Sequence, residues 1–282
     1  MKPAPFSYAR ARSLEHAFDL LAQGDGQAKV LAGGQSLMAT LNLRLSHPRL
    51  LVDINAIPDL DGIRLDGATL EIGALVRQSD AESSQMIAKH APLIARALGH
   101  VAHPAIRNRA TIGGSIAFAD PAAELPACLL ALDGEVVVAG RKGRRNVKAD
   151  NFFKDLFETA LGQDELLVAV RVPAAKAEHR YGFEELARRH GDYAIVGLAA
   201  AAIRAGNDLQ NVRIVYFAVG VTPVRARKAE AALAAGKIDD AVSAIAQDLD
   251  PSDDIQATRA YKLHAAGVLL RRAAKEMIGP GR

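Results

Sequence analysis

The amino-acid sequence predicts an α+β fold assembled from three successive pieces, and three patterns carry this prediction. A strand, a loop, a helix and a second strand follow one another over residues 28–55, which is the order of a βαβ unit. After Pro58 the pattern changes to alternating apolar and polar runs around Asp66 and Gly67, which is typical of an antiparallel hairpin. Towards the C-terminus, three strand-like runs precede a stretch with helical periodicity.

The N-terminal piece is predicted from caps and from the spacing of apolar residues. Ser13 can cap a helix in which apolar residues recur with helical spacing over 14–21. The stretch AKVLAGG reads as a short buried strand that runs into a turn. SLMATLNLRL after it is predicted to be helical, with Ser36 as its cap. LLVDIN is a second buried strand, and we expect it to pair in parallel with the first.

In the middle and C-terminal pieces, segments with the helical spacing of apolar residues are interspersed with strand-like runs. Helices are expected over 77–89 and 92–103 and in PAAELPACLLALDG, and strands in EVVVAG, RNVKADNFF and ELLVAVRVP. Pro173 and the polar residues after it mark a linker. The last piece has the strands YGFEELARR, YAIVGLAAAAI and VRIVYFAVG, and helices over 224–235, 238–248 and 256–277. The predicted domains are therefore 1–57, 58–175 and 176–282.

Composition and charge limit the classes of protein that fit this chain. Half of the 282 residues are hydrophobic, but no apolar run approaches the ~20 residues of a membrane span, and the N-terminus lacks the apolar stretch of a secretory signal. We therefore expect a cytoplasmic protein. The net charge is +3, and the densest basic stretch, GRKGRRNVK, is better explained by a solvated hairpin than by nucleic-acid binding. The single cysteine, Cys128, excludes an iron–sulfur cluster held by this chain alone.

Two Gly-Gly turns are the most informative motifs. The first supplies Gly33, Gly34, the amide of Gln35 and the hydroxyl of Ser36, and the second supplies Thr111, Gly113, Gly114 and Ser115. Glycine permits positive φ and brings bare N–H groups close to a ligand, and a helix that begins at such a turn attracts a diphosphate. Lys29 precedes the first turn and is within reach of a phosphate. Either motif alone can also be merely a tight turn, so the residues indicate only a site suited to an anionic cofactor.

No constellation for other chemistry stands out. The three spaced glycines of the dinucleotide fingerprint are missing, and neither turn continues into the Gly-Lys-Ser/Thr of a phosphate loop. His100 and His103 are three apart on a predicted helix with no third ligand nearby, which favours a surface pair over a metal site. Tyr193 precedes an apolar strand and by position alone reads as a core residue. We expect no catalytic side chain and no bound metal.

Taken together, these stretches resemble the FAD-binding medium subunit of the molybdenum hydroxylases, the carbon monoxide dehydrogenase and xanthine dehydrogenase group. The resemblance runs almost from end to end and includes VLAGGQSL, LEIGALVRQSD, IRNRATIGGSIAFADPAAELPACLLALDGEVVV, RRHGDYAIVG and VGVTPVRARKAEAAL. The order of the two glycine turns, with DPAAELP after the second, is specific to it. The resemblance implies a three-piece FAD-binding fold of the PCMH type, with a C-terminal domain that closes on the cofactor.

The resemblance also implies roles for individual residues. Residues 32–36 and 111–115 would wrap the diphosphate and the ribityl chain, Glu124 would contact ribose or ribityl hydroxyls, and Tyr193 would cover one face of the flavin ring. The expected cofactor-binding residues are Lys29, Leu31, Ala32, Gly33, Gly34, Gln35, Ser36, Leu37, Val101, Ala102, Thr111, Gly113, Gly114, Ser115, Glu124, Leu167 and Tyr193. Two positions depart from the pattern: Ser115 replaces a frequent Asn, and Glu185 stands near a position that is Lys in some relatives.

The implied function is electron transfer. A large partner subunit would hydroxylate the substrate at a molybdenum pterin, and GHVAHPAIRNRAT favours an N-heterocycle over carbon monoxide. A small partner would carry [2Fe–2S] clusters, and this chain would accept electrons on FAD and pass them to a final acceptor, in a dimer of heterotrimers. No nucleic acid and no membrane span are expected. The alternatives are a self-contained flavoenzyme with its own substrate site and an interaction protein that has lost the cofactor.

Overall fold

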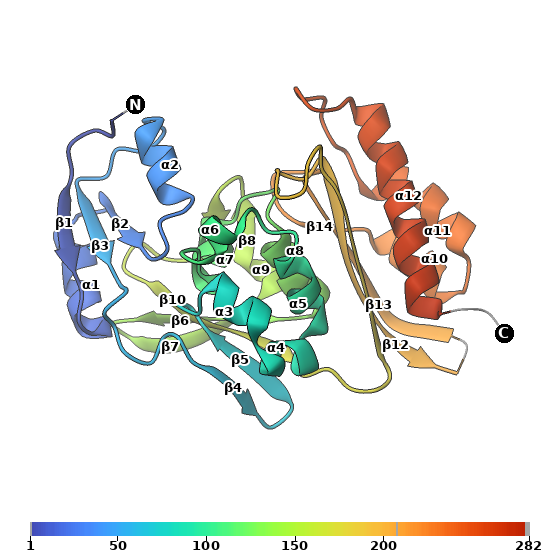
Figure 1. Ribbon diagram of the computed structural model, residues 1–282, viewed down its shortest axis with the longest axis horizontal. Helices are drawn as coiled ribbons and strands as arrows, with labels where there is room; N and C mark the ends of the chain where they lie inside the picture. Colours follow the sequence, from blue (N-terminus) through green and yellow to red (C-terminus); the bar gives the residue numbers. More distant parts are fainter. Residues whose placement is uncertain (1, 207, 280–282) are drawn as a thin grey trace.

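The computed structural model describes residues 2–206 and 208–279. Its three main sheets belong to the N-terminal, middle and C-terminal regions of the chain (Figure 1). The N-terminal region contains β1 (Ser7–Arg10), α1 (Leu14–Gln23), β2 (Ala28–Leu31), α2 (Leu37–Asn42) and β3 (Leu50–Asp53). Its strands have the order β1-β3-β2, and both pairs are parallel, as predicted for the βαβ unit. Strand β1 was not predicted, because its four mostly exposed residues carry no apolar pattern.

The caps of the two N-terminal helices differ from each other. Ser13 caps α1 as predicted, and its hydroxyl accepts a hydrogen bond of 3.1 Å from the backbone N–H of His16. Ser36 is the N-cap residue of α2, as predicted, but it already has helical backbone angles and its side chain accepts no capping bond. A capping residue needs an extended backbone for its side chain to reach the free N–H groups of the first turn.

The middle region is built around an antiparallel sheet with the strand order β4-β5-β10-β6-β7. Its strands are β4 (Ile63–Asp66), β5 (Thr69–Gly73), β6 (Glu135–Gly140), β7 (Gly143–Lys148) and β10 (Leu166–Pro173), with a small β8 (Phe153–Asp155) and β9 (Glu158–Thr159) ribbon. Its helices are α3 (Gln78–Ser83), α4 (Gln85–His90), α5 (Pro92–Leu98), α6 (Pro104–Arg107), α7 (Ile112–Phe118), α8 (Glu124–Ala131) and α9 (Ala149–Phe152). The predicted hairpin is confirmed: Asp66 pairs with Thr69, and Gly67 has φ +58°.

Several predicted helices of the middle region are shorter than their apolar spacing suggested. The segment 77–89 divides at Ser84, whose extended backbone ends α3 while its hydroxyl caps α4. The helix in the segment 92–103 ends at Leu98, so His100 lies in a turn and His103 is the extended residue before α6. The two histidines therefore do not share a helix face, contrary to the prediction. The predicted strand RNVKADNFF is interrupted by α9.

The C-terminal region contains one antiparallel sheet and three helices. Its strands, in the order β11-β12-β13-β14, are β11 (His179–Leu186), β12 (Val196–Ala205), β13 (Asp208–Phe217) and β14 (Val224–Arg225). The helices α10 (Arg227–Ala234), α11 (Ile238–Asp248) and α12 (Arg259–Ile278) lie on the outer side of this sheet (Figure 1). The three strands and three helices predicted for this piece are present, but the helix predicted over 224–235 begins at Arg227, because residues 224–225 form the unpredicted strand β14.

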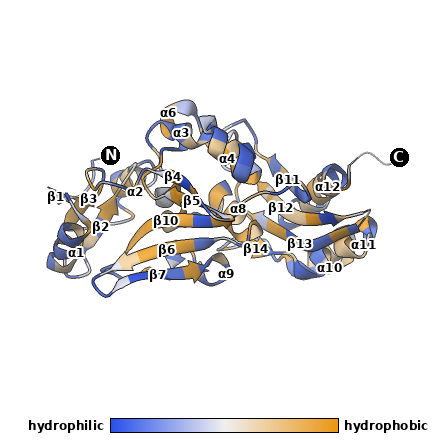
Figure 2. Ribbon diagram, turned by 90° about the horizontal axis from the view of Figure 1, so that it is seen from below, coloured by the Kyte–Doolittle hydropathy of each residue, from blue (hydrophilic) through white to orange (hydrophobic). Residues whose placement is uncertain are grey.

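Neighbouring regions share apolar cores, so they form one packed body. Phe18 and Val52 of the N-terminal region pack in the same cluster as Val137 and Leu166 of the middle sheet. On the other side of that sheet, helix α8 lies in a cluster with residues of the C-terminal strands. Apolar residues are concentrated on β6 and β10 between the two outer regions (Figure 2). Within the described residues, no helix combines the length and hydropathy needed to cross a membrane.

Candidate functional site

The two glycine turns, far apart in the sequence, lie against each other in the structure. A Cβ atom placed on Gly33 would stand 2.2 Å from the carbonyl oxygen of Arg109 and 2.8 Å from the Cα of Ala110. A Cβ atom on Gly114 would lie 3.9 Å from the Cβ of Ala32. Gly33 therefore permits a backbone-to-backbone approach that no other residue allows, and Gly114 leaves free the space that faces the first turn.

The first glycine turn, residues 32–36, has a row of free backbone donors. Gly34 has φ +73°, and the turn leads directly into α2. The N–H groups of residues 33–36 bond to no acceptor in the part of the chain that the structure describes. The side chain of Gln35 folds back instead, and its Nε2 donates to the carbonyl of Gly33 at 3.1 Å. Successive unpaired N–H groups form a concave anion-binding surface, so this turn can hold a diphosphate.

The second glycine turn, residues 111–115, is different because its N–H groups from residue 112 onward are already bonded. Ile112 donates to the carbonyl of Val76, and Gly113 donates to that of Ala74 at 2.9 Å. Gly114 donates to the hydroxyl of Thr111 at 3.0 Å, and this bond caps α7. The expectation that both turns offer bare N–H groups is therefore correct only for the first. The second contributes a closely packed wall on which Ser115 supplies a hydroxyl.

We expect Gly114→Val to abolish FAD binding. The new side chain would fill the space towards Ala32, and its Cβ would stand 2.7 Å from the hydroxyl of Thr111. The measurement is the FAD content of the purified variant relative to the wild type, with circular dichroism to establish that both are folded. A folded variant with normal FAD occupancy would contradict the assignment of the second turn to the site.

Beyond the second turn, a buried acidic residue begins helix α8. Glu124 is 8 % exposed, and burial, followed by the negative charge of Glu185, raises its pKa to about 8. Burial also raises the pKa of Asp120, although its carboxylate accepts a bond of 2.9 Å from the N–H of Ala122. A carboxyl group in this setting is stabilised by hydroxyl donors, which are what a ribose or a ribityl chain offers.

Glu185 contributes a second buried carboxyl group from strand β11. Its Oε2 atom has no hydrogen-bond partner among the described residues, and burial raises its pKa to about 7. The nearest base is His100, whose Nδ1 lies 3.7 Å from that oxygen. Burial lowers the pKa of His100, and the neighbouring His190 lowers it further. The sequence indicated Glu185 only as a departure from the pattern of relatives, and its burial could not be read from an alternating strand.

Tyr193 is not a core residue, contrary to the interpretation from its position alone. It is 64 % exposed, although it directly precedes a run of buried residues leading into β12. Partial burial, and then the negative charges of Asp120 and Glu124, raise its pKa, so these acidic groups are close enough for their charges to act on the phenol. An exposed aromatic ring next to the acidic groups is available to stack on a planar ligand.

The other predicted site residues are distributed around the turns. Val101 is 9 % exposed, and Ala102 has the unusual φ of +44° in the turn before α6. Leu167 is 5 % exposed on β10, in the core of the middle region rather than on an open surface. Lys29 is exposed on β2, whereas Leu31 and Leu37 are partly buried on either side of the first turn. The flavin contacts of these residues stay predictions.

Two residues that the sequence did not single out connect the two turns. Asn55 lies just beyond β3, and its Nδ2 donates to the carbonyl of Ala32 at 2.9 Å. Arg77 donates to the side-chain oxygen of Asn55 at 2.7 Å and to the carbonyl of Arg109 at 2.5 Å. One signal in the sequence could have indicated Asn55, because the C-terminal ends of neighbouring parallel strands meet at one edge of a sheet.

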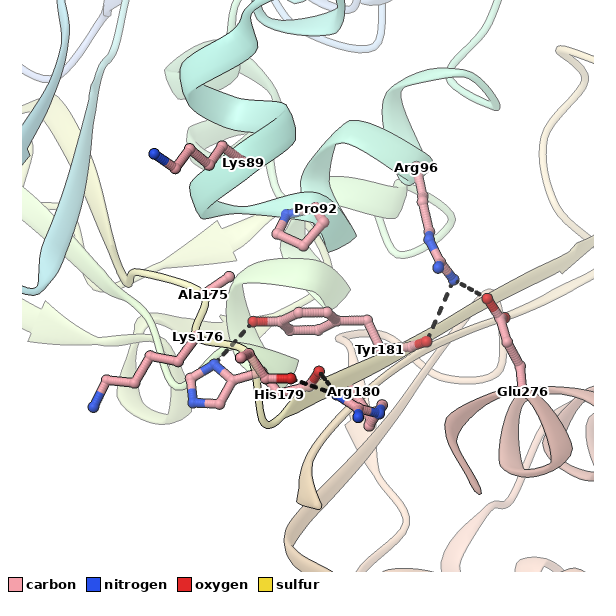
Figure 3. A pocket seen from close by; sticks show the side chains of 10 residues that line it. Lys89, Pro92, Arg96, Ala175, Lys176, His179, Arg180, Tyr181 and Glu276 are labelled. Atoms are coloured by element: carbon pink, nitrogen blue, oxygen red, sulfur yellow. Dashed lines mark hydrogen bonds and ion pairs between the residues drawn. The ribbon is translucent and has the colours of Figure 1, made fainter. Parts of the chain in front are cut away.

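A groove elsewhere in the molecule contains none of these residues. It has a volume of about 420 Å³ and is lined by Lys89, Arg96, Lys176, Tyr181 and Glu276, among others (Figure 3). It lies at the start of β11, whereas Glu185 lies near the end of that strand. Arg96 bonds to Glu276 and to the carbonyl of Tyr181, and no lining residue belongs to the glycine turns, so this groove is separate from the site that the turns form.

The residues that meet at the turns fit FAD. Free N–H groups and bare glycine surfaces suit a diphosphate, a buried carboxyl group suits sugar hydroxyls, and an exposed tyrosine suits a planar ring. The two glycine turns touch directly, and Glu124 begins the helix α8 that packs against α7, the helix that begins in the second turn.

Comparison with known proteins agrees with this geometry. Residues 4–175 match a family described as the FAD binding domain in molybdopterin dehydrogenase, and residues 181–277 match the CO dehydrogenase flavoprotein C-terminal domain. The chain is 40 % identical to the 6-hydroxypseudooxynicotine dehydrogenase complex subunit alpha of Paenarthrobacter nicotinovorans, over 96 % of this chain and 94 % of that protein.

Two solved structures are also similar over nearly the whole chain. Carbon monoxide dehydrogenase from Hydrogenophaga pseudoflava matches with a TM-score of 0.95 and 38 % identity, covering 98 % of each chain. Quinoline 2-oxidoreductase from Pseudomonas putida 86 matches with a TM-score of 0.93 and 34 % identity, covering 99 % of this chain and 98 % of that one. The chain therefore belongs to the family of FAD-binding medium subunits of the molybdenum hydroxylases, as its glycine turns and the sequence around them had indicated.

Proposed function

We propose that this chain holds FAD between its two glycine turns and serves as the electron-transfer subunit of a molybdenum hydroxylase complex. The observation that carries the proposal is the direct contact of the two turns, with free N–H groups on the first turn. Residues 33–36 would bind the diphosphate, and residues 113–115 would close the opposite wall. The division into domains 1–57, 58–175 and 176–282 is part of this proposal, with FAD lying at the first boundary.

In this proposal the chain binds and orients the cofactor, and its side chains carry out no acid–base chemistry on a substrate. Bound FAD supplies the redox chemistry, because it accepts electrons one at a time and releases them as a pair. Glu124 would accept hydrogen bonds from ribose or ribityl hydroxyls, and Tyr193 would cover one face of the ring.

The partners in the proposal are a large subunit with a molybdenum pterin and a small subunit with [2Fe–2S] clusters, assembled as a dimer of heterotrimers. Cys128, the single cysteine, is buried, so the clusters belong on another chain. We propose an N-heterocycle as the substrate of the complex. Similarity to a quinoline oxidoreductase and to a 6-hydroxypseudooxynicotine dehydrogenase subunit supports this class.

The test is to purify the chain from its native source with everything that copurifies, and to record the visible spectrum and the subunit pattern. We expect flavin absorbance released as FAD, iron–sulfur absorbance, and one larger and one smaller companion chain. A yellow protein that turns over a small molecule without companions would support a self-contained flavoenzyme instead. A colourless preparation that stays colourless after FAD is added would contradict the proposal.

We expect Tyr193→Ala to weaken FAD binding by about 10-fold, because stacking on an aromatic ring contributes about 1–3 kcal/mol. Tyr193→Phe keeps the ring and should bind FAD within about twofold of the wild type. FAD titration of the deflavinated complex, followed by absorbance, measures both. Equal affinity of the alanine variant and the wild type would show that the tyrosine does not cover the flavin.

A further inference from the structure

Two polar side chains join the N-terminal region to the middle region beside the glycine turns. Asn55 is fixed to the N-terminal sheet, because its backbone N–H and its Nδ2 donate to Oδ1 of Asp53 at 2.8 and 2.7 Å. Asp53 is buried, and its other carboxylate oxygen accepts a short hydrogen bond from the hydroxyl of Tyr8. The same Nδ2 of Asn55 also holds the carbonyl of Ala32, at the start of the first turn.

Arg77 is fixed to the second turn in the same way, but by its backbone. Residue 77 forms an isolated antiparallel bridge with Thr111, and the neighbouring N–H of Gln78 donates to the carbonyl of Ala110 at 2.9 Å. Its guanidinium group then donates to the carbonyl of Arg109 and, across the junction, to Oδ1 of Asn55. Each end of the Asn55–Arg77 hydrogen bond is thus tied to one glycine turn.

We propose that Asn55 and Arg77 form a clamp that sets the separation of the two glycine turns and thereby the affinity for FAD. The inference rests on the proposed position of FAD between the turns. Asn55 and Arg77 are positioning residues in this proposal, because they act through the backbone of residues 32 and 109. Two parallel donors on a planar guanidinium group hold two acceptors in a fixed geometry, which the flexible ammonium group of lysine cannot reproduce.

A purely electrostatic role for Arg77 is the competing explanation. Arg77 and Arg109 lie close enough for the charge of Arg109 to lower the pKa of Arg77, after the larger effect of burial. The charges of Asp80 and Asp53 act on Arg77 as well, but no ion pair with a carboxylate is formed by either arginine among the described residues, so their positive charge is available to a diphosphate. The clamp and the electrostatic explanation make different predictions for Asn55, which carries no charge. Replacing Asn55 should weaken FAD binding if the clamp is correct, and should have no effect if only the charge of Arg77 matters.

The experiment compares Arg77→Ala, Arg77→Lys, Asn55→Ala and the double variant Asn55→Ala/Arg77→Ala in the complex that contains the full chain. FAD is removed and titrated back to measure its dissociation constant, and the unfolding temperature of the FAD-free complex is recorded in parallel. Arg64→Ala is the matched control, because Arg64 is exposed and forms an ion pair with Glu71 at 2.6 Å in the same region.

We expect the alanine variants and Arg77→Lys to bind FAD about tenfold more weakly, which corresponds to about 1.4 kcal/mol. The double variant should bind no more weakly than Arg77→Ala, because both substitutions remove the same link. The control should bind like the wild type, and the unfolding temperatures should agree within a few degrees.

Two results would overturn the clamp while leaving FAD binding itself intact. In the first, Asn55→Ala binds like the wild type and Arg77→Lys restores the affinity, so that only the charge of Arg77 matters. In the second, every loss of affinity is accompanied by a matching loss of unfolding temperature, so that the residues merely stabilise the fold. A wild-type complex that binds no FAD at all would overturn the proposed function and the clamp together.

Discussion

Replacing Gly33 with alanine should weaken FAD binding by about 10- to 100-fold, the largest effect on affinity that we expect from a single added methyl group. The new Cβ would stand 2.2 Å from the carbonyl oxygen of Arg109, and backbone atoms cannot rotate away as a side chain does. The two turns must therefore separate, at a cost of about 1–3 kcal/mol that is typical of overpacking. The separation moves the free N–H groups of the first turn away from the opposite wall.

The matched control for this prediction is Gly62→Ala. Gly62 lies beside the middle sheet, and a Cβ there would meet nothing within 4 Å. FAD titration of both variants and thermal unfolding of their FAD-free forms separate a loss of affinity from a loss of folding. If the Gly33 variant bound FAD as tightly as the Gly62 variant, the contact between the turns would have no role in binding.

Glu124→Gln should change the pH dependence of stability more than any other single substitution of a charged residue. The carboxyl group of Glu124 has a pKa of about 8 in the folded chain, against about 4.5 as its ordinary value. Between these two values the folded chain binds one more proton than the unfolded chain. Its contribution to stability is therefore complete below about pH 4.5 and is lost as the pH rises through about 8.

The expected slope from Glu124 is a loss of up to about 1.4 kcal/mol in the free energy of unfolding per pH unit within this window. Glutamine does not titrate, so the variant should become progressively more stable than the wild type as the pH rises from 5 to 8. Unfolding of the FAD-free chain in urea at several pH values measures this difference. The exposed Glu158 supplies the control variant Glu158→Gln. Parallel curves for the wild type and both variants would mean that Glu124 is ionised in the folded protein.

Local patterns in the sequence were sufficient for most elements of the fold. Ser13 caps α1, Asp66 and Gly67 lie at the hairpin, and the three alternating runs near the C-terminus pair as antiparallel strands. Each of these depends on the side chains of a few neighbouring residues, which is why they could be predicted. The predicted helices were too long where the apolar spacing continued beyond the end of the actual helix, as at Ser84 and Leu98. The spacing of apolar residues does not show where tertiary contacts end a helix.

The site residues likewise divide into those that a local pattern indicates and those that only tertiary contacts reveal. The glycine turns could be recognised because few residues other than glycine tolerate such backbone angles and contacts. Tyr193 was ambiguous, because a residue before an apolar strand can face either the core or the solvent, and only the structure places it on the surface. Arg77 gave no local signal and Asn55 only its place at the end of a parallel strand, since each acts on a turn that is distant in the sequence.

By itself, the sequence determined the α+β class, the order of the elements, the family and the cofactor, because these depend on side-chain periodicity and on motifs of neighbouring residues. Only the tertiary structure decided that Gly33 packs on Arg109, that the N–H groups of the second turn are already bonded, and that two buried carboxyl groups lie near each other. Hydrogen-bond partners, burial and the pKa values that follow from it are properties of residues brought together across regions, and no local pattern encodes them.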